Sequence, residues 1–370
     1  MFDFLPEFLR TPLAFVVVLG VLVFIHELGH YLAARWRGVY VEAFSIGFGP
    51  KLVSWTDSIG TVWKICLLPL GGYVKMHGQE QATDVSAETR AAWKPGQTFN
   101  EKSVLSRAIV VAAGPVANFA LASLLFALMF AVSGRPLTEP VVGGVVENSA
   151  AAEVGLVTGD RIDAIDGTKI TRFEEIQAII GAHPGQQVKL DFTRDGRGMS
   201  VNATPQSRNS FGRTIGVLGV RGGKVIYEPV SAISALPEGI ARTWTVAEQT
   251  LTGVIQMITG QRGTDDLGGP LRIAQLSGQV AQLGFASLVS FIAVLSVNLG
   301  LINLFPIPVL DGGHLVFYLF EALRGKPLPP RTLEYGLRAG FALLIGLFVF
   351  ATWNDLSHFG LFSWVSGLLS

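Results

Sequence analysis

The chain has 370 residues, of which 49% are hydrophobic and only 15% are charged. Because soluble globular proteins carry about 25% charged residues, this composition is not typical of one. The 28 basic and 28 acidic side chains cancel to a formal net charge of +0, so nothing indicates a nucleic-acid partner. The single cysteine, Cys66, excludes an intrachain disulfide framework.

Four segments of the chain are apolar enough to predict membrane-spanning helices. Residues 108–132 and 284–310 carry no ionisable side chain, and each run exceeds the roughly 20 residues that cross a bilayer. Two weaker candidates, residues 11–34 and 337–353, flank them. The N-terminus lacks the basic region and cleavage site of a signal peptide, so we expect the first span to stay in the mature protein.

The charges of the short loops predict the orientation of these spans. Arginines and lysines gather in segments 35–107 and 324–338, and none follows Trp353. By the positive-inside rule, both segments face the cytoplasm. We therefore expect both termini, and the long segment between the second and third spans, on the outer side.

The first span contains the motif His-Glu-Leu-Gly-His at residues 26–30. On a helix, His26 and His30 lie on one face and can reach the same metal ion. An ionisable side chain at membrane depth costs roughly 2.5–3.5 kcal/mol, which a bound ion offsets. A catalytic zinc site uses three protein ligands and leaves a position for water, whose proton Glu27 can accept. The alternative is two buried histidines that only bond neighbouring helices.

Residues 44–76 alternate apolar and polar side chains, with glycine and proline at the turns. This pattern predicts short strands and hairpins. Their apolar residues favour a sheet that dips towards the membrane, although a small soluble hairpin over a loop fits equally well. Residues 77–103 are polar and predict a surface loop.

Residues 141–206 have the composition of a soluble domain with alternating strands and helices. The stretch GLVTGDRIDAIDGTKI resembles the PDZ domains of bacterial envelope proteases. Such domains bind extended peptides by adding a strand to a sheet edge.

Residues 229–262 form an amphipathic helical pattern. We expect a long connecting helix on the outer membrane surface. A fifth span is the less favoured alternative, because Glu238, Arg242 and Glu248 lie within the segment.

Asp311 is the best candidate for a third metal ligand, because it closes the longest uncharged run of the chain. Pro306 and Pro308 prevent a regular helix just before it. Irregular backbone at membrane depth requires burial against protein or a wet cavity. The alternative is an Asp311 that caps the following helix; beside the histidine pair, the ligand interpretation is favoured.

Two further polar residues have two interpretations each. Asn118, within the second span, either bonds near the metal site or holds helices together. His314 lies one helical turn after Asp311 and is either close to the site or an ordinary polar residue at a helix start.

The HELGH motif together with NLFPIPVLDGGH resembles the site-2 protease family of intramembrane zinc metalloproteases. The closest likeness is to the bacterial regulator-of-sigma-E protease group, since FSIGFGP, LPLGGYVKM, FNEKSVLSRAIVVAAGPVANF and LGGPLRIAQLSG also match in order. The resemblance implies one Zn²⁺ per chain, with Glu27 as general base. It implies that His26, His30 and Asp311 are the ligands.

The resemblance also implies how a substrate is held. Residues 61–76 would form a membrane-re-entrant β-hairpin that receives unwound substrate. The residues that would contact or position this substrate are Gly71, Gly72, Tyr73, Asn303, Pro306 and Pro308.

The fold class that follows is an α-helical polytopic membrane protein with four transmembrane helices, a re-entrant β-hairpin and one inserted PDZ (α+β) domain. The predicted parts are 1–36 (first span), 37–103 (cytoplasmic loop with hairpin), 104–133 (second span), 141–206 (PDZ), 207–280 (connecting segment), 281–323 (third span and active-site segment), 332–354 (fourth span) and 355–370 (tail). Well-studied members of this group carry two tandem PDZ domains, whereas this chain has one.

The implied function is metalloendopeptidase activity in regulated intramembrane proteolysis, in the bacterial inner membrane with a periplasmic PDZ domain. Implied substrates are single-span proteins in the lipid bilayer, such as anti-sigma factors after a first cleavage, and signal-peptide remnants. The PDZ domain would bind substrate termini or the product of an upstream protease, or exclude bulky ectodomains. The alternatives are a membrane PDZ scaffold without activity, and a different class of HExxH membrane metalloprotease.

Overall fold

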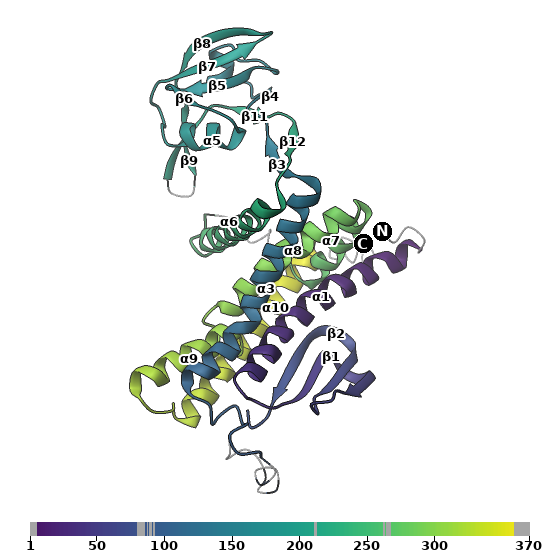
Figure 1. Cartoon of the computed structure of the whole chain (residues 1–370). Coiled ribbons are helices and arrows are strands. Elements are labelled where there is room, and N and C mark those ends of the chain that lie inside the picture. Colours follow the sequence, from purple (N-terminus) through teal and green to yellow (C-terminus); the bar gives the residue numbers. More distant parts are fainter. Residues whose placement is uncertain are drawn as a thin grey trace, which may run out of the picture. The chain divides into compact units, whose positions relative to one another are not determined.

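The computed structural model describes residues 6–79, 86, 88, 91, 93–210, 213–261, 263 and 268–358. The chain divides into two compact units (Figure 1). The first unit comprises Met1–Leu128, Leu236–Leu251 and Thr264–Ser370, and the second comprises Met129–Ala235 and Thr252–Gly263.

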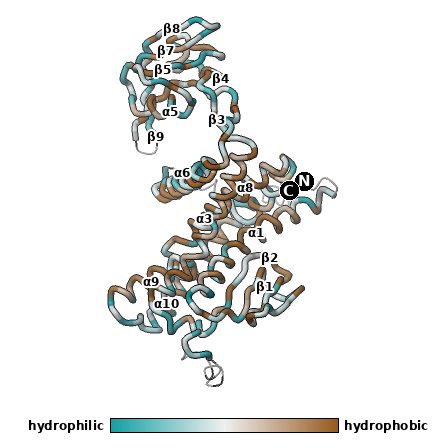
Figure 2. The backbone as a smooth tube through the Cα atoms, in the orientation of Figure 1, coloured by the Kyte–Doolittle hydropathy of each residue, from teal (hydrophilic) through white to brown (hydrophobic). Residues whose placement is uncertain are grey.

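In the part of the chain that the structure describes, four helices are long and apolar enough to cross a membrane. They are α1 (Glu7–Trp36), α3 (Val104–Ser133), α8 (Phe285–Leu304) and α10 (Pro330–His358). Each has 20 residues or more, the length that a bilayer requires. Hydrophobic residues dominate the tubes of α1 and α3 (Figure 2). Large apolar side chains of α3 such as Leu124 and Val132 are exposed. The four predicted spans are thus confirmed as helices, and the chain is a multi-pass membrane protein.

Helix α1 packs against α7 (Pro270–Gln282) and α8. The packed residues are Ala14, Val18, Leu22, Ala281, Leu288 and Ile292. Helix α10 is joined to the start of α7 by Asp355, which is 2% exposed. Its carboxylate accepts hydrogen bonds from the backbone N–H groups of Gly269 (2.8 Å), Leu271 (3.1 Å) and Arg272 (3.1 Å). A carboxylate at a helix N-terminus is stabilised by the orphan N–H groups and the helix dipole.

A β-hairpin follows α1 and consists of β1 (Val41–Thr56) and β2 (Val62–Met76). Residues 43–46 of β1 pair with residues 62–65 of β2 and also with residues 72–75, so this part of β1 lies between two parts of β2. The prediction of separate short strands is therefore wrong. Gly47 and Gly49, both at φ +84°, let one long strand bend instead.

The far half of this hairpin exposes large apolar side chains, among them Leu52, Val53 and Trp55. Side chains of this kind in contact with water mark an interaction surface. Residues 61–76 do not form a hairpin by themselves, contrary to the prediction, because both halves of β2 pair with β1 rather than with each other. The hairpin is formed by β1 and β2 together, and its insertion into the membrane stays a prediction.

The segment from 77 to 103 is not entirely a surface loop, contrary to the prediction. His77, Thr98 and Phe99 are buried. The backbone N–H of His77 donates to the carbonyl of Tyr40 (2.9 Å), and that of Phe99 donates to the carbonyl of His77 (2.7 Å). The loop returns to the base of the hairpin and packs there, which its polar composition did not indicate. Most of residues 80–92 lie outside the described part of the chain.

The second unit is built on a four-stranded sheet of order β6-β5-β7-β8. Its strands are β5 (Arg161–Ile165), β6 (Thr168–Lys169), β7 (Val188–Arg194) and β8 (Arg197–Ala203), accompanied by α4 (Ala150–Glu153) and α5 (Phe173–Gly181). Every second side chain of β7, from Val188 through Leu190 to Phe192, is buried. These meet Ile162 and Ile176 in one apolar core, as a half-buried sheet requires.

Three pairs of short strands complete this unit. They are β3 (Arg135–Thr138) with β12 (Val225–Glu228), β4 (Val142–Val145) with β11 (Val220–Gly222), and β9 (Gln206–Ser210) with β10 (Arg213–Val217). Because Leu218 belongs to the core and β11 pairs with β4, the domain extends beyond the predicted end at residue 206. A pairing between strands about 75 residues apart leaves no mark in the local sequence pattern.

Helix α6 (Ala232–Ile258) matches the predicted amphipathic connecting helix. It is not among the four described helices that are apolar enough to span a membrane. Its central part is bonded to the other helices of the first unit, because Ser123 donates to Thr243 (3.1 Å) and Thr250 donates to Asn298 (2.9 Å). Its place on the outer membrane surface stays a prediction.

Helix α8 ends at Leu304, and α9 (Asp311–Arg324) begins seven residues later. The interruption predicted from Pro306 and Pro308 is confirmed. Val309 in this segment has φ +91°, a conformation that a β-branched residue rarely adopts. The break delivers Asp311 at the first position of α9.

Candidate metal centre

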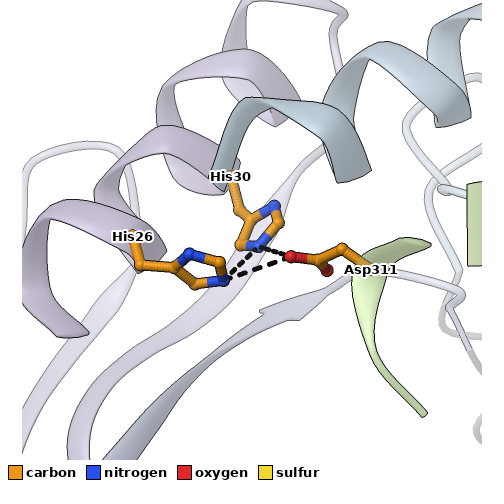
Figure 3. Close-up of side chains that lie close together, drawn as sticks. All are labelled: His26, His30 and Asp311. Atoms are coloured by element: carbon orange, nitrogen blue, oxygen red, sulfur yellow. Dashed lines mark hydrogen bonds and ion pairs between the residues drawn. The ribbon is translucent and has the colours of Figure 1, made fainter. Parts of the chain in front are cut away.

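His26, His30 and Asp311 point towards one another (Figure 3). The two Nε2 atoms lie 3.2 Å apart, and Asp311 Oδ2 lies 3.2 Å from His26 Nε2 and 3.4 Å from His30 Nε2. The histidines come from one face of α1, as the i, i+4 spacing predicts. The structure therefore brings together the three predicted ligands, which we call the metal centre.

The ring of His30 is held so that one nitrogen stays available for a metal. Its Nδ1 lies 2.9 Å from the carbonyl oxygen of Val110 on α3. Because a carbonyl oxygen only accepts, Nδ1 must carry the hydrogen, and the lone pair remains on Nε2. A hydrogen bond of this kind orients most metal-binding histidines.

Asn118 holds the ring of His26 in the same way. The side-chain amide of this fully buried residue lies 3.1 Å from His26 Nδ1. If His26 binds metal through Nε2, its Nδ1 carries the hydrogen, and Asn118 must present its oxygen rather than its nitrogen. Asn118 also joins α3 to α8, since the Ser296 hydroxyl donates to its backbone carbonyl (2.8 Å). Both interpretations of Asn118 therefore describe real contacts.

The three converging atoms fit a zinc ion. Asp311 Oδ2 is buried without a hydrogen-bond partner, and with both Nε2 atoms unprotonated, three lone-pair acceptors face one another. Such a cluster is unstable unless a cation compensates it. Zinc bonds of about 2.0–2.1 Å in a tetrahedron place neighbouring ligand atoms about 3.3 Å apart, close to the observed 3.2–3.4 Å. Two imidazoles and a carboxylate are also a typical catalytic zinc set.

The capping alternative for Asp311 is not realised. Leu310 is the N-cap of α9, and the helix start has no side-chain cap bond. The carboxylate instead turns to the histidines. Tertiary packing therefore decides between the two roles that the sequence left open.

Glu27 lies beside the metal centre in a cavity of about 830 Å³. Its Cγ lies 3.0 Å from the place that a Cβ on Gly72 would occupy. Gly72 therefore leaves the room in which the Glu27 side chain sits. Its role as general base stays a prediction, which this position supports.

Two glycines bring the helices of the centre together. A Cβ on Gly29 would collide with the carbonyl of Ala113 on α3, so this glycine lets the backbones of α1 and α3 approach closely. A Cβ on Gly114 would collide with His30 Nε2 and lie 2.9 Å from His26 Cε1. Sequence reasoning did not identify Gly114. The sequence feature that could have identified it is a small residue next to Pro115 within a predicted span, because small residues mark contacts between membrane helices.

The other predicted site residues fall into two groups. Gly72, Tyr73, Asn303 and His314 line the cavity. Among the described residues, Gly71, Pro306 and Pro308 do not line it. Gly71 adopts φ +129° at the bend before Gly72, and the two prolines shape the segment before Asp311. Their predicted contacts with substrate stay predictions.

Asn303 and His314 differ in how they are held within the cavity. The Asn303 amide donates to the carbonyl of Leu299 on the preceding helical turn (3.1 Å), which fixes its direction. His314 makes an edge contact with the ring of Phe317, with centroids 6.2 Å apart. His314 also lines the cavity that contains the metal centre.

Three residues that sequence reasoning missed also line the cavity. Arg107 of α3 forms an ion pair with Glu321 of α9 and lies over the ring of Tyr318. Arg107 was counted only as one of the basic residues that orient the second span. No local pattern joins residues 214 positions apart.

Comparison with known proteins identifies the family. Residues 14–347 match the model of peptidase family M50. The chain is 44% identical to a candidate zinc metalloprotease of Agrobacterium fabrum, over 93% of this chain and 94% of that protein. It is 36% identical to metalloprotease MmpA of Caulobacter vibrioides (98% and 99% covered) and 33% identical to zinc metalloprotease RasP of Geobacillus kaustophilus (95% and 99% covered).

Part of the chain is also similar to solved structures. The crystal structure of the PDZ domain of an SdrC-like protein from Listeria monocytogenes is 25% identical, covers 22% of this chain and 84% of that chain, and has a TM-score of 0.20.

The family match decides between the alternatives that the sequence left open. The alternatives were a scaffold without enzymatic activity and a different class of HExxH protease. The match to family M50 excludes both, and it agrees with Asp311 lying beside the two histidines. The chain belongs to peptidase family M50 and is a zinc metalloprotease of the site-2 protease type.

Proposed function

We propose that this metalloprotease cuts single-span membrane proteins within the bilayer, near its cytoplasmic side. The observation that carries the proposal is one cavity lined by the metal centre, Glu27 and an edge of the β-hairpin. The histidines lie in the second half of α1, a candidate span that has Arg35 in its last turn and Arg37 directly after its end. By the positive-inside rule, this half lies towards the cytoplasm, with both termini and the β-rich second unit on the periplasmic side of a bacterial inner membrane.

The hairpin offers a place to hold an unwound substrate. Residues 72–76 pair with the first half of β1 on one side, and no described strand pairs with their other side. Gly72, Tyr73, Val74 and Met76 line the cavity. An extended peptide can add to such an edge through backbone hydrogen bonds. A transmembrane helix must unwind before cleavage, because its backbone groups are otherwise bonded internally. Hydrogen bonds to this strand edge would replace the helical hydrogen bonds that unwinding breaks.

The chemistry follows from the residues around the cavity. His26, His30 and Asp311 would hold Zn²⁺, which polarises the scissile carbonyl and activates a water molecule. Glu27 lines the cavity beside the metal centre, where it can accept the proton of that water and pass it to the leaving amine. Asn303, fixed by its bond to Leu299, can donate a hydrogen bond to the peptide backbone.

The substrate class follows from the site and from the second unit together. We propose membrane-anchored anti-sigma factors already trimmed on the outer side, and signal-peptide remnants. The second unit, interpreted as a PDZ domain, would bind the new substrate terminus or exclude untrimmed ectodomains. A cavity lined by residues of all four candidate spans, as well as by β2, favours a chain that reaches it through the bilayer.

The test compares purified wild type with Glu27→Gln on a single-span substrate that lacks an ectodomain. We expect the wild type to cut within the span and the zinc-loaded variant to lose about 10²–10⁴-fold in rate. Glu174→Gln, on the exposed face of α5, is the matched control and should keep wild-type activity. Equal activity of Glu27→Gln, or faster cleavage of a soluble unfolded peptide than of the membrane substrate, would contradict the proposal.

A further inference from the structure

We propose that Ser106 and Arg107, adjacent residues at the start of α3, are positioning residues that set the distance between the two helices carrying the zinc ligands. Helix α1 carries both histidines, and α9 carries Asp311. Each of these helices is tied to α3 by one of the two residues. The inference concerns the geometry of the zinc site, and it rests on the proposed membrane cleavage only for its kinetic readout.

Ser106 holds the end of α1. The guanidinium of Arg37, directly after that helix, donates to the Ser106 hydroxyl from Nη2 (2.7 Å) and Nε (3.2 Å). Ser106 is 6% exposed, so this bond is shielded from water. One turn further along α3, Val110 accepts the bond from His30. The histidine helix is therefore aligned along the first two turns of α3.

Arg107 holds α9. Its guanidinium makes two bonds to the Glu321 carboxylate, Nη2 to Oε1 (2.6 Å) and Nη1 to Oε2 (3.2 Å), and both side chains are 13% exposed. The guanidinium also lies over the Tyr318 ring, 5.0 Å from its centroid, and its Nε donates to the Lys102 carbonyl (3.2 Å). A two-bonded guanidinium fixes direction as well as distance.

The pair acts on Asp311 through the stiffness of a helix. Glu321 and Asp311 belong to the same helix, ten residues apart, which is about 15 Å at 1.5 Å per residue. The near end of α9 is pressed against other backbone, since a Cβ on Gly312 or Gly313 would collide with the carbonyls of Leu304, Phe305 and Ile307. Because Asp311 lies beside this fixed end, movement at Glu321 would tilt the helix and turn the Asp311 carboxylate through the same angle relative to the histidines.

The experiment uses the full-length, zinc-loaded protein in detergent and compares Arg107→Met, Arg107→Lys, Glu321→Gln and the exchange Arg107→Glu with Glu321→Arg. Zinc affinity is measured by chelator competition, ligand geometry by the visible absorption of the Co²⁺-substituted protein, and kcat and KM on the membrane substrate. Arg338→Met is the control, because it removes an exposed ion pair with Glu334 on α10.

We expect Arg107→Met and Glu321→Gln to weaken zinc binding by about 10–100-fold and to alter the Co²⁺ spectrum, as loss of ligand-orienting contacts does. The rate kcat should fall with KM within about twofold, Arg107→Lys should be intermediate, and the exchange should recover most of the zinc affinity. Ser106→Ala should show a smaller loss of the same kind. If Arg107→Met does not fold, Arg107→Lys and the exchange decide the question.

Two results would overturn the inference. Unchanged zinc affinity and Co²⁺ spectrum with a raised KM would mean that Arg107 contacts the peptide instead. Failure of the exchange to recover zinc affinity in a folded protein would mean that the ion pair does not set the geometry. Zinc binding and the Co²⁺ spectrum are independent of cleavage, so failure of the proposed function would leave both readouts intact.

Discussion

The core of the second unit and the metal centre of the first unit differ in how their buried polar groups are hydrogen-bonded. The core consists of apolar side chains such as Ile162, Leu190 and Phe192. Asp160, the one buried carboxylate among the described residues of this unit, is bonded to Arg194 and to the Val157 N–H. The metal centre instead leaves Asp311 Oδ2 buried without a hydrogen bond. Polar bonding therefore stabilises the core of the second unit, whereas the metal centre keeps its polar atoms available for a ligand.

Asp311→Ala should have the largest effect on the metal centre. Removing the carboxylate leaves two imidazoles, which is one ligand fewer than a catalytic zinc site uses. We expect loss of bound zinc by metal analysis and no detectable cleavage, while the second unit stays folded. Zinc retained at wild-type affinity would show that the third ligand is another residue.

Gly114→Ala should damage the metal centre without removing a ligand. The new methyl group would collide with His30 Nε2, and crowding a packed site costs about 1–3 kcal/mol. We expect a loss of about 10–100-fold in zinc affinity by chelator competition. Gly346→Ala on α10, where nothing lies within 4 Å, is the matched control and should bind zinc normally. Equal affinity in both variants would mean that the helices separate easily at Gly114.

Asn118 provides a test of side-chain orientation. Asn118→Leu removes the acceptor for His26 Nδ1 and should weaken zinc binding by about 10-fold or more, whereas Asn118→Asp keeps an acceptor and should bind at least as tightly as wild type. Chelator competition on both variants measures this. If Asn118→Asp were the weaker binder, the amide would be donating to His26, and the orientation assigned above would be wrong.

The second unit should instead respond to acid. Burial raises the pKa of the Asp160 carboxyl, but the Arg194 guanidinium and the Val157 N–H outweigh it and hold that pKa below its usual value. The stabilisation is therefore present above the unfolded-state pKa of about 3.9 and is lost as the pH falls further. Charge-assisted bonds of this kind contribute about 1.5–3 kcal/mol.

Hydrogen exchange of the full-length protein measures this effect. Amides of β5 and β7 should exchange faster below pH 4 than at pH 6, after correction for the intrinsic rate. Asp160→Asn should exchange faster at pH 6 and lose most of the pH dependence. A wild-type domain equally protected at both values would contradict the assigned role of Asp160.

The sequence predicted the ligands because their physical cost is visible in it. His26, His30 and Asp311 interrupt uncharged runs, and the i, i+4 spacing places the histidines together on any helix. The four apolar helices and the break before Asp311 followed from length, hydrophobicity and proline in the same way. These features depend on residues close together in the chain.

The sequence did not predict the contacts that surround these residues. The bends of the hairpin, the buried ends of the segment from 77 to 103 and the strand pair β4–β11 all arise from packing between distant segments. Gly114 and Arg107 looked like an ordinary small residue and an ordinary loop charge. Their partners lie more than 80 positions away, so no local pattern could indicate them.

Residue type and spacing were enough to predict zinc chemistry and membrane spans, because candidate ligands, a candidate general base and apolar runs are all visible in the sequence. Packing between distant segments turned the Asp311 carboxylate towards the histidines rather than to the start of α9, and it made one cavity that joins the metal centre to a strand edge. The physical reason is that ligand identity is local, whereas ligand geometry depends on how α1, α3 and α9 pack. Differences of a few tenths of an ångström there decide whether three lone pairs can share one ion.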